Sequence, residues 1–199
     1  MQKAIVNVIL DESGSMDIVR DDTIGGFNQY IQTLKNDAEI EYDVTLTLFN
    51  DSASVEYAKT PLADVRPLSR SVYAPQKLTA LLDAVGETLT AIGEVPSDVK
   101  CVVVIITDGH ENASREFTTD QIRKMISDRD KKDNWTFAYL GAVADAWGQA
   151  GALGINVANA AQFTGATTDA AFRDTAGATL CSVRSVGKMR NFYGEHKKF

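Results

Sequence analysis

The chain has 199 residues, of which 44% are hydrophobic and 24% charged, and its formal net charge is −7. This length suits one well-packed α/β domain and is short of what two domains normally need. The negative charge argues against general nucleic-acid binding, which depends on clustered Lys and Arg side chains that neutralise phosphates. We therefore expect a single domain over residues 1–199 that binds no nucleic acid.

No segment of the chain is typical of a membrane or secreted protein. The longest uninterrupted apolar run, Cys101–Ile106, is far below the ~20 residues that a membrane helix requires. The first residues lead directly into a strand pattern, without the features of a secretory signal. Cys101 lies in a buried-strand pattern and Cys181 in a late helix, which favours free thiols in a reducing compartment. The sequence thus predicts a cytoplasmic protein without a membrane segment.

The first half of the chain alternates strand and helix patterns. Residues 4–10 form an apolar strand pattern, and apolar residues at helical spacing predict a helix over 22–36. Period-two alternation predicts a strand at 44–49, with 52–57 as its hairpin partner. This pair would place one antiparallel strand at the edge of an otherwise parallel sheet.

The second half continues the alternation. A helix is expected over 78–92, closed by Gly93, and then a continuous apolar strand over 101–107. Thr118 and Gln121 form a capping box for the next helix. The remaining expected elements are a strand at 135–140, a short helix at 145–153, a weak strand at 155–157 and a final helix along 172–187. The pattern predicts an α/β fold with a doubly wound, mostly parallel central sheet and helices on both faces.

Oxygen-bearing side chains follow two of these strands and precede one helix. The first strand runs into the motif Asp11-x-Ser13-x-Ser15, Asp108 follows the strand at 101–107, and Thr79 stands at the start of the helix between them. Carboxylates and hydroxyls are hard ligands of the kind that Mg²⁺, Mn²⁺ or Ca²⁺ prefers. In open α/β sheets, ligands bind at the carboxyl ends of the strands, so these segments are expected to converge on one divalent-cation site.

These five residues, taken in their order along the chain, resemble the metal-ion-dependent adhesion site of von Willebrand factor A (VWA) domains. The stretches Thr79–Ala84 and Thr107–Asn112 are similar to the contexts of the family's later site segments, and Arg20–Asn28 is similar to bacterial and phage-associated members. The match covers roughly the first two-thirds of the chain. The family often has Gly-Gly before the threonine, whereas this chain has Gln76-Lys77-Leu78, which leaves the path of that loop open.

The resemblance implies a VWA or Rossmann-like fold and a role for each site residue. It implies that Ser13, Ser15 and Thr79 bind the metal directly, while Asp11 and Asp108 supply negative charge, directly or through water. It also implies that the sixth position, on Mg²⁺ or else Mn²⁺ or Ca²⁺, is left for an Asp or Glu of a partner protein. Stand-alone intracellular members commonly work in larger assemblies, such as an AAA+ machine, a stress-response complex or a phage-encoded complex.

Each site residue also has a structural interpretation. An Asp followed by Ser residues often caps the next helix, Thr79 alone is typical of an N-cap, and Asp108-Gly109 alone is typical of a turn. Asp83 lies four residues after Thr79, on the same helical face, and is either a hydrogen-bond acceptor behind the ligands or a helix-surface charge.

Three further segments keep two interpretations. Gly25-Gly26 lies inside a predicted helix, where each glycine costs about 1 kcal/mol against alanine, so it indicates either close packing or a soft point beside the site. The proline-containing stretch 60–77 is either a recognition loop or a surface connection. His110 and Glu111 are either part of the rim of the site or an ordinary exposed His beside a charge.

Catalytic functions find little support in the motifs. A phosphatase of the haloacid dehalogenase type needs a second aspartate where this chain has Ser13, and a serine hydrolase needs a Gly-x-Ser-x-Gly elbow with a histidine base. A phosphate-binding glycine motif is also missing. We expect a binding module rather than an enzyme, with a Mg²⁺-dependent phosphoester hydrolase as the alternative.

The C-terminal segment is rich in basic and aromatic residues. Its basic side chains are Lys188, Arg190, His196, Lys197 and Lys198. Basic residues are favoured near a helix C-terminus, so residues 190–199 are expected to form a flexible basic tail, and a docking tail for an acidic partner is the alternative.

Overall fold

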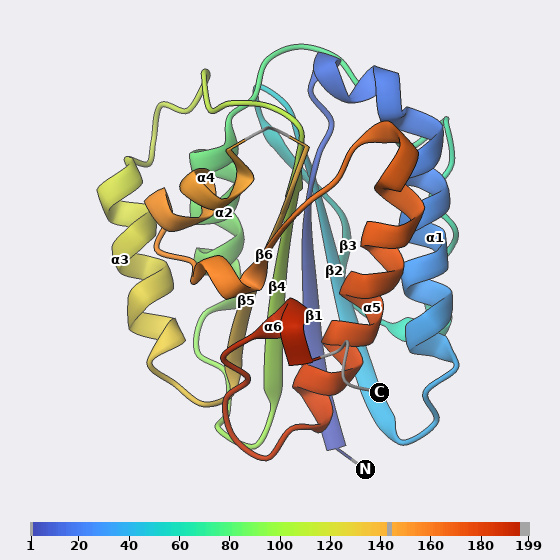
Figure 1. Ribbon diagram of the computed structural model, residues 1–199, viewed down its shortest axis with the longest axis vertical. Coiled ribbons are helices and arrows are strands. Elements are labelled where there is room, and N and C mark those ends of the chain that lie inside the picture. Colours follow the sequence, from blue (N-terminus) through green and yellow to red (C-terminus); the bar gives the residue numbers. More distant parts are fainter. Residues whose placement is uncertain (1, 143–144, 196–199) are drawn as a thin grey trace.

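The computed structural model describes residues 2–142 and 145–195. Its centre is a six-stranded sheet with the strand order β3-β2-β1-β4-β5-β6, and helices cover both of its faces (Figure 1). All neighbouring strands are parallel except β2 and β3, which form an antiparallel pair at one edge. The strands are β1 (Gln2–Asp11), β2 (Ile40–Phe49), β3 (Ala53–Pro61), β4 (Lys100–Thr107), β5 (Trp135–Gly141) and β6 (Ala160–Gln162). The predicted fold class is therefore confirmed.

In the described part of the chain, six α-helices and four short 3₁₀ helices accompany the strands, and η4, α5 and α6 follow the last strand. The α-helices are α1 (Arg20–Lys35), α2 (Leu81–Ile92), α3 (Thr119–Asp130), α4 (Ala146–Ala152), α5 (Thr168–Arg184) and α6 (Phe192–Glu195) within the described ranges. The 3₁₀ helices are η1 (Gly14–Val19), η2 (Leu62–Asp64), η3 (Val157–Asn159) and η4 (Gly165–Thr167). The predicted capping box of Thr118 and Gln121 is present at the start of α3.

Two hydrophobic cores lie on opposite faces of the sheet. Successive residues of β1 point into different cores, as Val8 and Ile9 do. One core joins the sheet to α1, α5 and α6, and the other joins it to α2, α3 and α4 (Figure 1). Burial on both faces explains why β4 is a continuous apolar run rather than an alternating one.

The glycines of α1 have different surroundings. A β-carbon at Gly26 would lie 2.7 Å from Cγ of the buried Phe172 of α5, whereas one at Gly25 would have no neighbouring atom within 4 Å. Gly26 therefore allows α1 and α5 to pack closely, which confirms the packing interpretation at this position. Gly25 has no such packing partner.

Several predicted boundaries differ from the structure. The weak strand expected at 155–157 was wrong: Val157 begins the 3₁₀ helix η3, and the strand that pairs with β5 is Ala160–Gln162. Small residues carry no alternation signal, and the strand forms there because the edge of β5 lies beside it. Helix α2 begins at Leu81 rather than at residue 78, so Thr79 precedes the helix.

The expected basic tail is partly folded. Phe192 is fully buried, and its backbone N–H donates to Oδ1 of Asn159 at 2.9 Å. Lys188 forms an ion pair with Asp130 at 2.6 Å. Residues 192–195 thus form the short helix α6, which the buried ring of Phe192 joins to the core. His196, Lys197 and Lys198 of the expected tail lie outside the described residues.

Two further observations concern the sequence-based expectations on cysteines and membranes. Cys101 is buried, Cys181 is partly buried, and both are free thiols. Within residues 2–142 and 145–195, every helix is too short or too polar to cross a lipid bilayer.

Candidate metal centre

The candidate site lies at the carboxyl end of the sheet, between β1 and β4. These strands are parallel neighbours in the register Leu10 to Ile106, so Asp11 and Thr107 come to the same edge. The chain leaves β1 toward α1 on one face and leaves β4 toward α3 on the other (Figure 1). This is a topological switch point, where open α/β sheets form their binding crevices.

Hydroxyl and carboxylate oxygens converge at this point. The Oγ atoms of Ser13 and Ser15 are 3.2 Å apart, and Ser15 Oγ donates to Oδ1 of Asp108 at 2.6 Å. A β-carbon at Gly109 would lie 3.1 Å from Oγ1 of Thr79 and 3.6 Å from Oγ of Ser15, so these two hydroxyls border the same small space. The structure therefore brings together the side chains that the sequence analysis selected from three separate segments.

Asp11, at the end of β1, anchors the loop of residues 12–15, which is called the site loop below. Its carboxylate is fully buried, with Oδ1 accepting from the N–H of Ser13 at 2.7 Å and Oδ2 from the hydroxyl of Thr107 at 2.5 Å. Its backbone carbonyl accepts from the hydroxyl of Tyr73 at 2.7 Å. Because both carboxylate oxygens are engaged by protein donors, Asp11 is suited to supplying charge and fixing the loop rather than to direct ligation.

Asp11 and Asp108 have no counter-ion among the described residues. Burial raises the pKa of Asp11 to about 6; hydrogen bonds from Thr107 and Ser13 oppose this shift, and the nearby charge of Asp108 adds to it. Burial also raises the pKa of Asp108, against the hydrogen bond from Ser15. Among the described residues, no Lys, Arg or His forms an ion pair with either carboxylate. A bound cation would offset this uncompensated negative charge.

The donor set fits a hard divalent cation. Three hydroxyls and two carboxylates are oxygen ligands of the type that Mg²⁺, Mn²⁺ and Ca²⁺ use. None of the described residues hydrogen-bonds to the hydroxyl of Thr79, which is nearly buried and lies two residues before α2. Ala80 rather than Thr79 is the N-cap of α2, so the N-cap interpretation of Thr79 was wrong. Within the described part, no group of three His, Cys, Asp or Glu side chains could hold a metal, so hydroxyl ligands are essential to this site.

The loop before Thr79 follows the site loop closely. Backbone N–H groups of Gly14 and Gln76 donate to the carbonyls of Lys77 and Glu12 at 3.2 and 2.9 Å, and the N–H of Ala74 donates to Oε1 of Glu12 at 2.6 Å. Lys77 has a φ of 67°, a left-handed conformation that glycine adopts more readily. The loop path left open by the missing Gly-Gly is thus held by these contacts with residues 12–14.

The loop after Asp108 hydrogen-bonds to both the backbone N–H and the backbone carbonyl of Thr79. Oδ1 of Asn112 accepts from the N–H of Thr79 at 2.9 Å, and the N–H of Asn112 donates to the carbonyl of Thr79 at 3.0 Å. The carboxylate of Glu111 accepts from the N–H of Leu82 at 3.0 Å, at the start of α2. Sequence reasoning missed these roles, because an Asn or Glu in a loop carries no signal of the backbone it will meet.

Asp83 has a third role, different from both expected ones. Its carboxylate accepts from the backbone N–H groups of Arg115, Glu116 and Phe117 at 2.7 to 2.9 Å. It therefore ties α2 to the loop that leads into α3, and within the described residues it does not hydrogen-bond to a candidate ligand. His110 is turned toward α4, where its Nδ1 lies 2.7 Å from Nε2 of Gln149.

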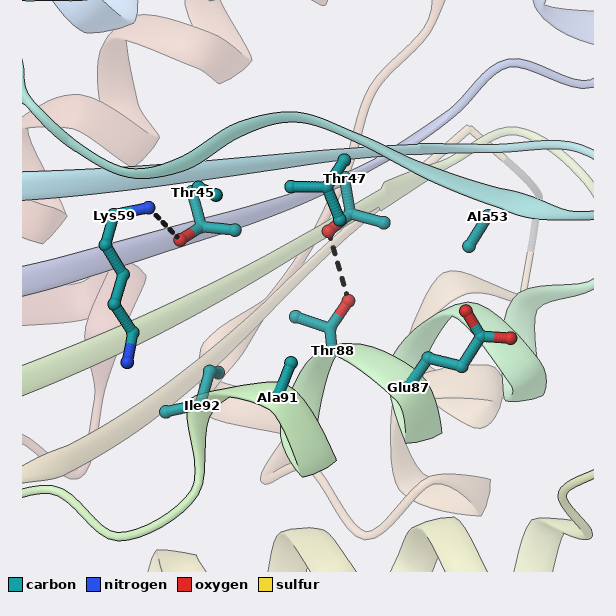
Figure 2. Close-up of a pocket in the computed structure, with 10 residues that line it drawn as sticks. Thr45, Thr47, Ala53, Lys59, Glu87, Thr88, Ala91 and Ile92 are labelled. Carbon is teal, nitrogen blue, oxygen red and sulfur yellow. Dashed lines mark hydrogen bonds between the residues drawn. The ribbon is translucent and has the colours of Figure 1, made fainter.

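A separate groove lies between α2 and the edge of the sheet. It has a volume of about 310 Å³, and Figure 2 shows its lining side chains on β2, β3 and α2. The hydroxyl of Thr88 donates to that of Thr47 at 3.1 Å across the groove, with Lys59 and Glu87 toward opposite ends (Figure 2). None of the candidate metal ligands lines it.

No protein-family model matches the chain, and no curated protein does. Solved structures share its fold: the vWF domain of the type V pili tip protein Mfa5 from Porphyromonas gingivalis has a TM-score of 0.65 at 12% identity, over 92% of this chain and 97% of that one. Proximal thread matrix protein 1 from the mussel byssus, with a zinc-occupied MIDAS motif, has 0.61 at 13%, over 86% and 46%. Manganese-loaded Plasmodium vivax TRAP protein has 0.57 at 16%, over 85% and 72%.

These similarities establish the class of fold. The mostly parallel sheet with one antiparallel edge strand is that of the VWA domains, a Rossmann-like α/β fold. The chain spans about half the length of the mussel protein that it matches.

Proposed function

We propose that the chain is a metal-dependent protein-binding module. The observation that carries the proposal is the convergence of Ser13, Ser15 and Thr79 with the buried carboxylate of Asp11 and the half-buried carboxylate of Asp108, neither of which has an ion-pair partner among the described residues. A divalent cation supplies the missing positive charge and, held mostly by neutral hydroxyls, retains Lewis acidity toward a further ligand. The zinc-occupied and manganese-loaded structures of similar fold support a divalent cation.

The residues of the chain have distinct tasks in this proposal. The hydroxyls of Ser13, Ser15 and Thr79 hold the cation. Asp108 orients Ser15 through its hydrogen bond, and Asp11 supplies negative charge from the end of β1. An Asp or Glu side chain of a partner protein completes the site by replacing a water molecule. Mg²⁺ is the proposed physiological ion, with Mn²⁺ or Ca²⁺ as alternatives.

The setting is also part of the proposal. We place the protein in the cytoplasm, as a stand-alone VWA protein of bacterial or phage type that works within a larger assembly. The motif similarity of Arg20–Asn28 to bacterial and phage-associated members supports this placement.

Isothermal titration calorimetry with Mg²⁺, Mn²⁺ and Ca²⁺ tests the metal site. The wild type is expected to bind at least one of these ions, and the double variant Ser13→Ala/Ser15→Ala to lose binding while keeping its unfolding transition. Ser54→Ala, on the exposed edge strand β3, serves as the matched control and keeps the wild-type affinity. A wild-type protein that takes up none of the three ions would refute the proposal.

A binding role is proposed rather than catalysis. Among the described residues, His110 bonds to Gln149 rather than to a serine hydroxyl, which supports this choice. A phosphatase assay of the wild type with Mg²⁺ and a general phosphoester substrate is expected to show no turnover. Mg²⁺-dependent turnover that disappears in Asp11→Ala would instead support the phosphoester hydrolase.

A further inference from the structure

Two exposed apolar side chains lie close in sequence to the candidate metal ligands. In the described part of the chain, six large apolar side chains are strongly exposed, and two of them adjoin the candidate ligands in sequence. Ile18 is 92% exposed on η1, the helix that contains Ser15, and Leu78 is 56% exposed immediately before Thr79. Solvent exposure of such residues has no benefit for folding, and a place beside a binding centre makes them candidates for contact with its ligand.

A small pocket lies beside the loop that follows Asp108. Gln149 of α4 bonds to His110 of this loop. A pocket of about 190 Å³ lies between this helix and the start of α2, and its lining includes Leu81, Leu82, His110, Gln149 and Leu153. The pocket therefore begins two residues after Thr79 and two residues after Asp108, directly beside the metal centre.

The opposite end of the molecule provides a comparison. Val186 is also fully exposed, but it follows α5 near the amino-terminal ends of the strands. The side chain of Gln2, at the start of β1, donates to the carbonyl of Val183, and that of Lys100, at the start of β4, donates to the carbonyl of Gly187. An apolar residue there cannot contact a ligand held at the carboxyl ends of β1 and β4.

We propose that the carboxylate captured by the metal centre is flanked, in the partner protein, by large apolar side chains. Those side chains pack on Ile18 and Leu78 and enter the pocket beside Leu82, while the acid reaches the cation. The inference rests on the proposed function and adds the kind of sequence that is recognised. An apolar surround excludes water from the metal–carboxylate contact, and contacts at the centre of an interface strengthen when water is excluded.

Two synthetic peptides with blocked ends test the inference. One carries a central glutamate between two leucines, and the other carries the same glutamate between two serines, with glycines outside. Binding is measured by NMR titration in Mg²⁺ and in EDTA, for the wild type and for Ile18→Ser, Leu78→Ser and Val186→Ser. Metal affinity is measured for every variant, so that loss of the cation is distinguished from loss of the apolar surface.

The leucine-flanked peptide is expected to bind about tenfold more tightly in Mg²⁺, because burial of one leucine side chain corresponds to about a tenfold change in affinity. This preference should shrink in Ile18→Ser and Leu78→Ser and stay unchanged in Val186→Ser. Equal binding of the two peptides, or a preference that survives both site variants, would overturn the inference and leave the proposed function standing. Failure of both peptides to bind, or binding that EDTA does not weaken, would overturn the proposed function and the inference together.

Discussion

Replacing Gly26 by alanine is expected to destabilise the protein, although alanine is the better helix former. The new β-carbon would lie 2.7 Å from Cγ of Phe172 and closer still to Cδ2, whereas carbon atoms in contact prefer about 3.5–4.0 Å. The ring is buried and packed between α1 and α5, so either the ring or a helix has to move by about 1 Å.

The size of the effect follows from two opposing terms. Overpacking of a core costs about 1–3 kcal/mol, and the gain in helix propensity from glycine to alanine is about 1 kcal/mol. We therefore expect Gly26→Ala to lower the free energy of unfolding by up to about 2 kcal/mol. Gly25→Ala is the matched control: it has open space around its β-carbon and should raise the free energy of unfolding by about 1 kcal/mol.

Urea denaturation of the three proteins in EDTA measures both effects without a contribution from metal binding. The two variants should move the transition midpoint in opposite directions. Equal and stabilising shifts would show that α1 and α5 do not approach as closely as described, and the packing role of Gly26 would then be refuted.

Three other perturbations probe the site and the groove. Because the raised pKa of Asp11 means that the folded, metal-free protein binds this proton more tightly than the unfolded chain does, the free energy of unfolding should fall by about 2 kcal/mol as pH rises from 4 to 6. A proton on Asp11 also competes with a bound cation, so calorimetry should show that Mg²⁺ affinity weakens up to about tenfold per pH unit below pH 6. An affinity that does not change between pH 5 and 7 would contradict this prediction. Asn112→Ala leaves the N–H of Thr79 without its acceptor, so chemical denaturation should show a loss of about 1–3 kcal/mol and calorimetry a weaker metal affinity; unchanged values would show that the loop does not position Thr79. Thr88→Val removes the donor to Thr47 and should cost about 1–2 kcal/mol in thermal unfolding, whereas a neutral result would mean that water replaces this bond.

Much of the site could be predicted because its signals are local. Asp11 and Asp108 each end or follow an apolar strand, and parallel neighbouring strands bring their ends to one edge of a sheet. To predict that Asp11 and Asp108 lie side by side, only the order of the strands in the sheet had to be assumed. The alternation of strands and helices restricts that order to few possibilities. The residues that hold the loops could not be predicted in this way. Glu12 and Asn112 accept backbone N–H groups of segments far away in the chain, and those partners depend on the path of each loop.

The sequence by itself determined the architecture and the chemistry of the candidate site, because strand and helix periodicity and the order of oxygen-bearing residues are written along the chain. Only the tertiary structure decided the course of the loop at Lys77, the place of strand β6 and the burial of Phe192. In each case the local residues have no strong preference, and contacts with distant backbone or core select one conformation. The pairing of β6 with β5 at Tyr139 illustrates this most directly, since its three small or polar residues become a strand only beside an available edge.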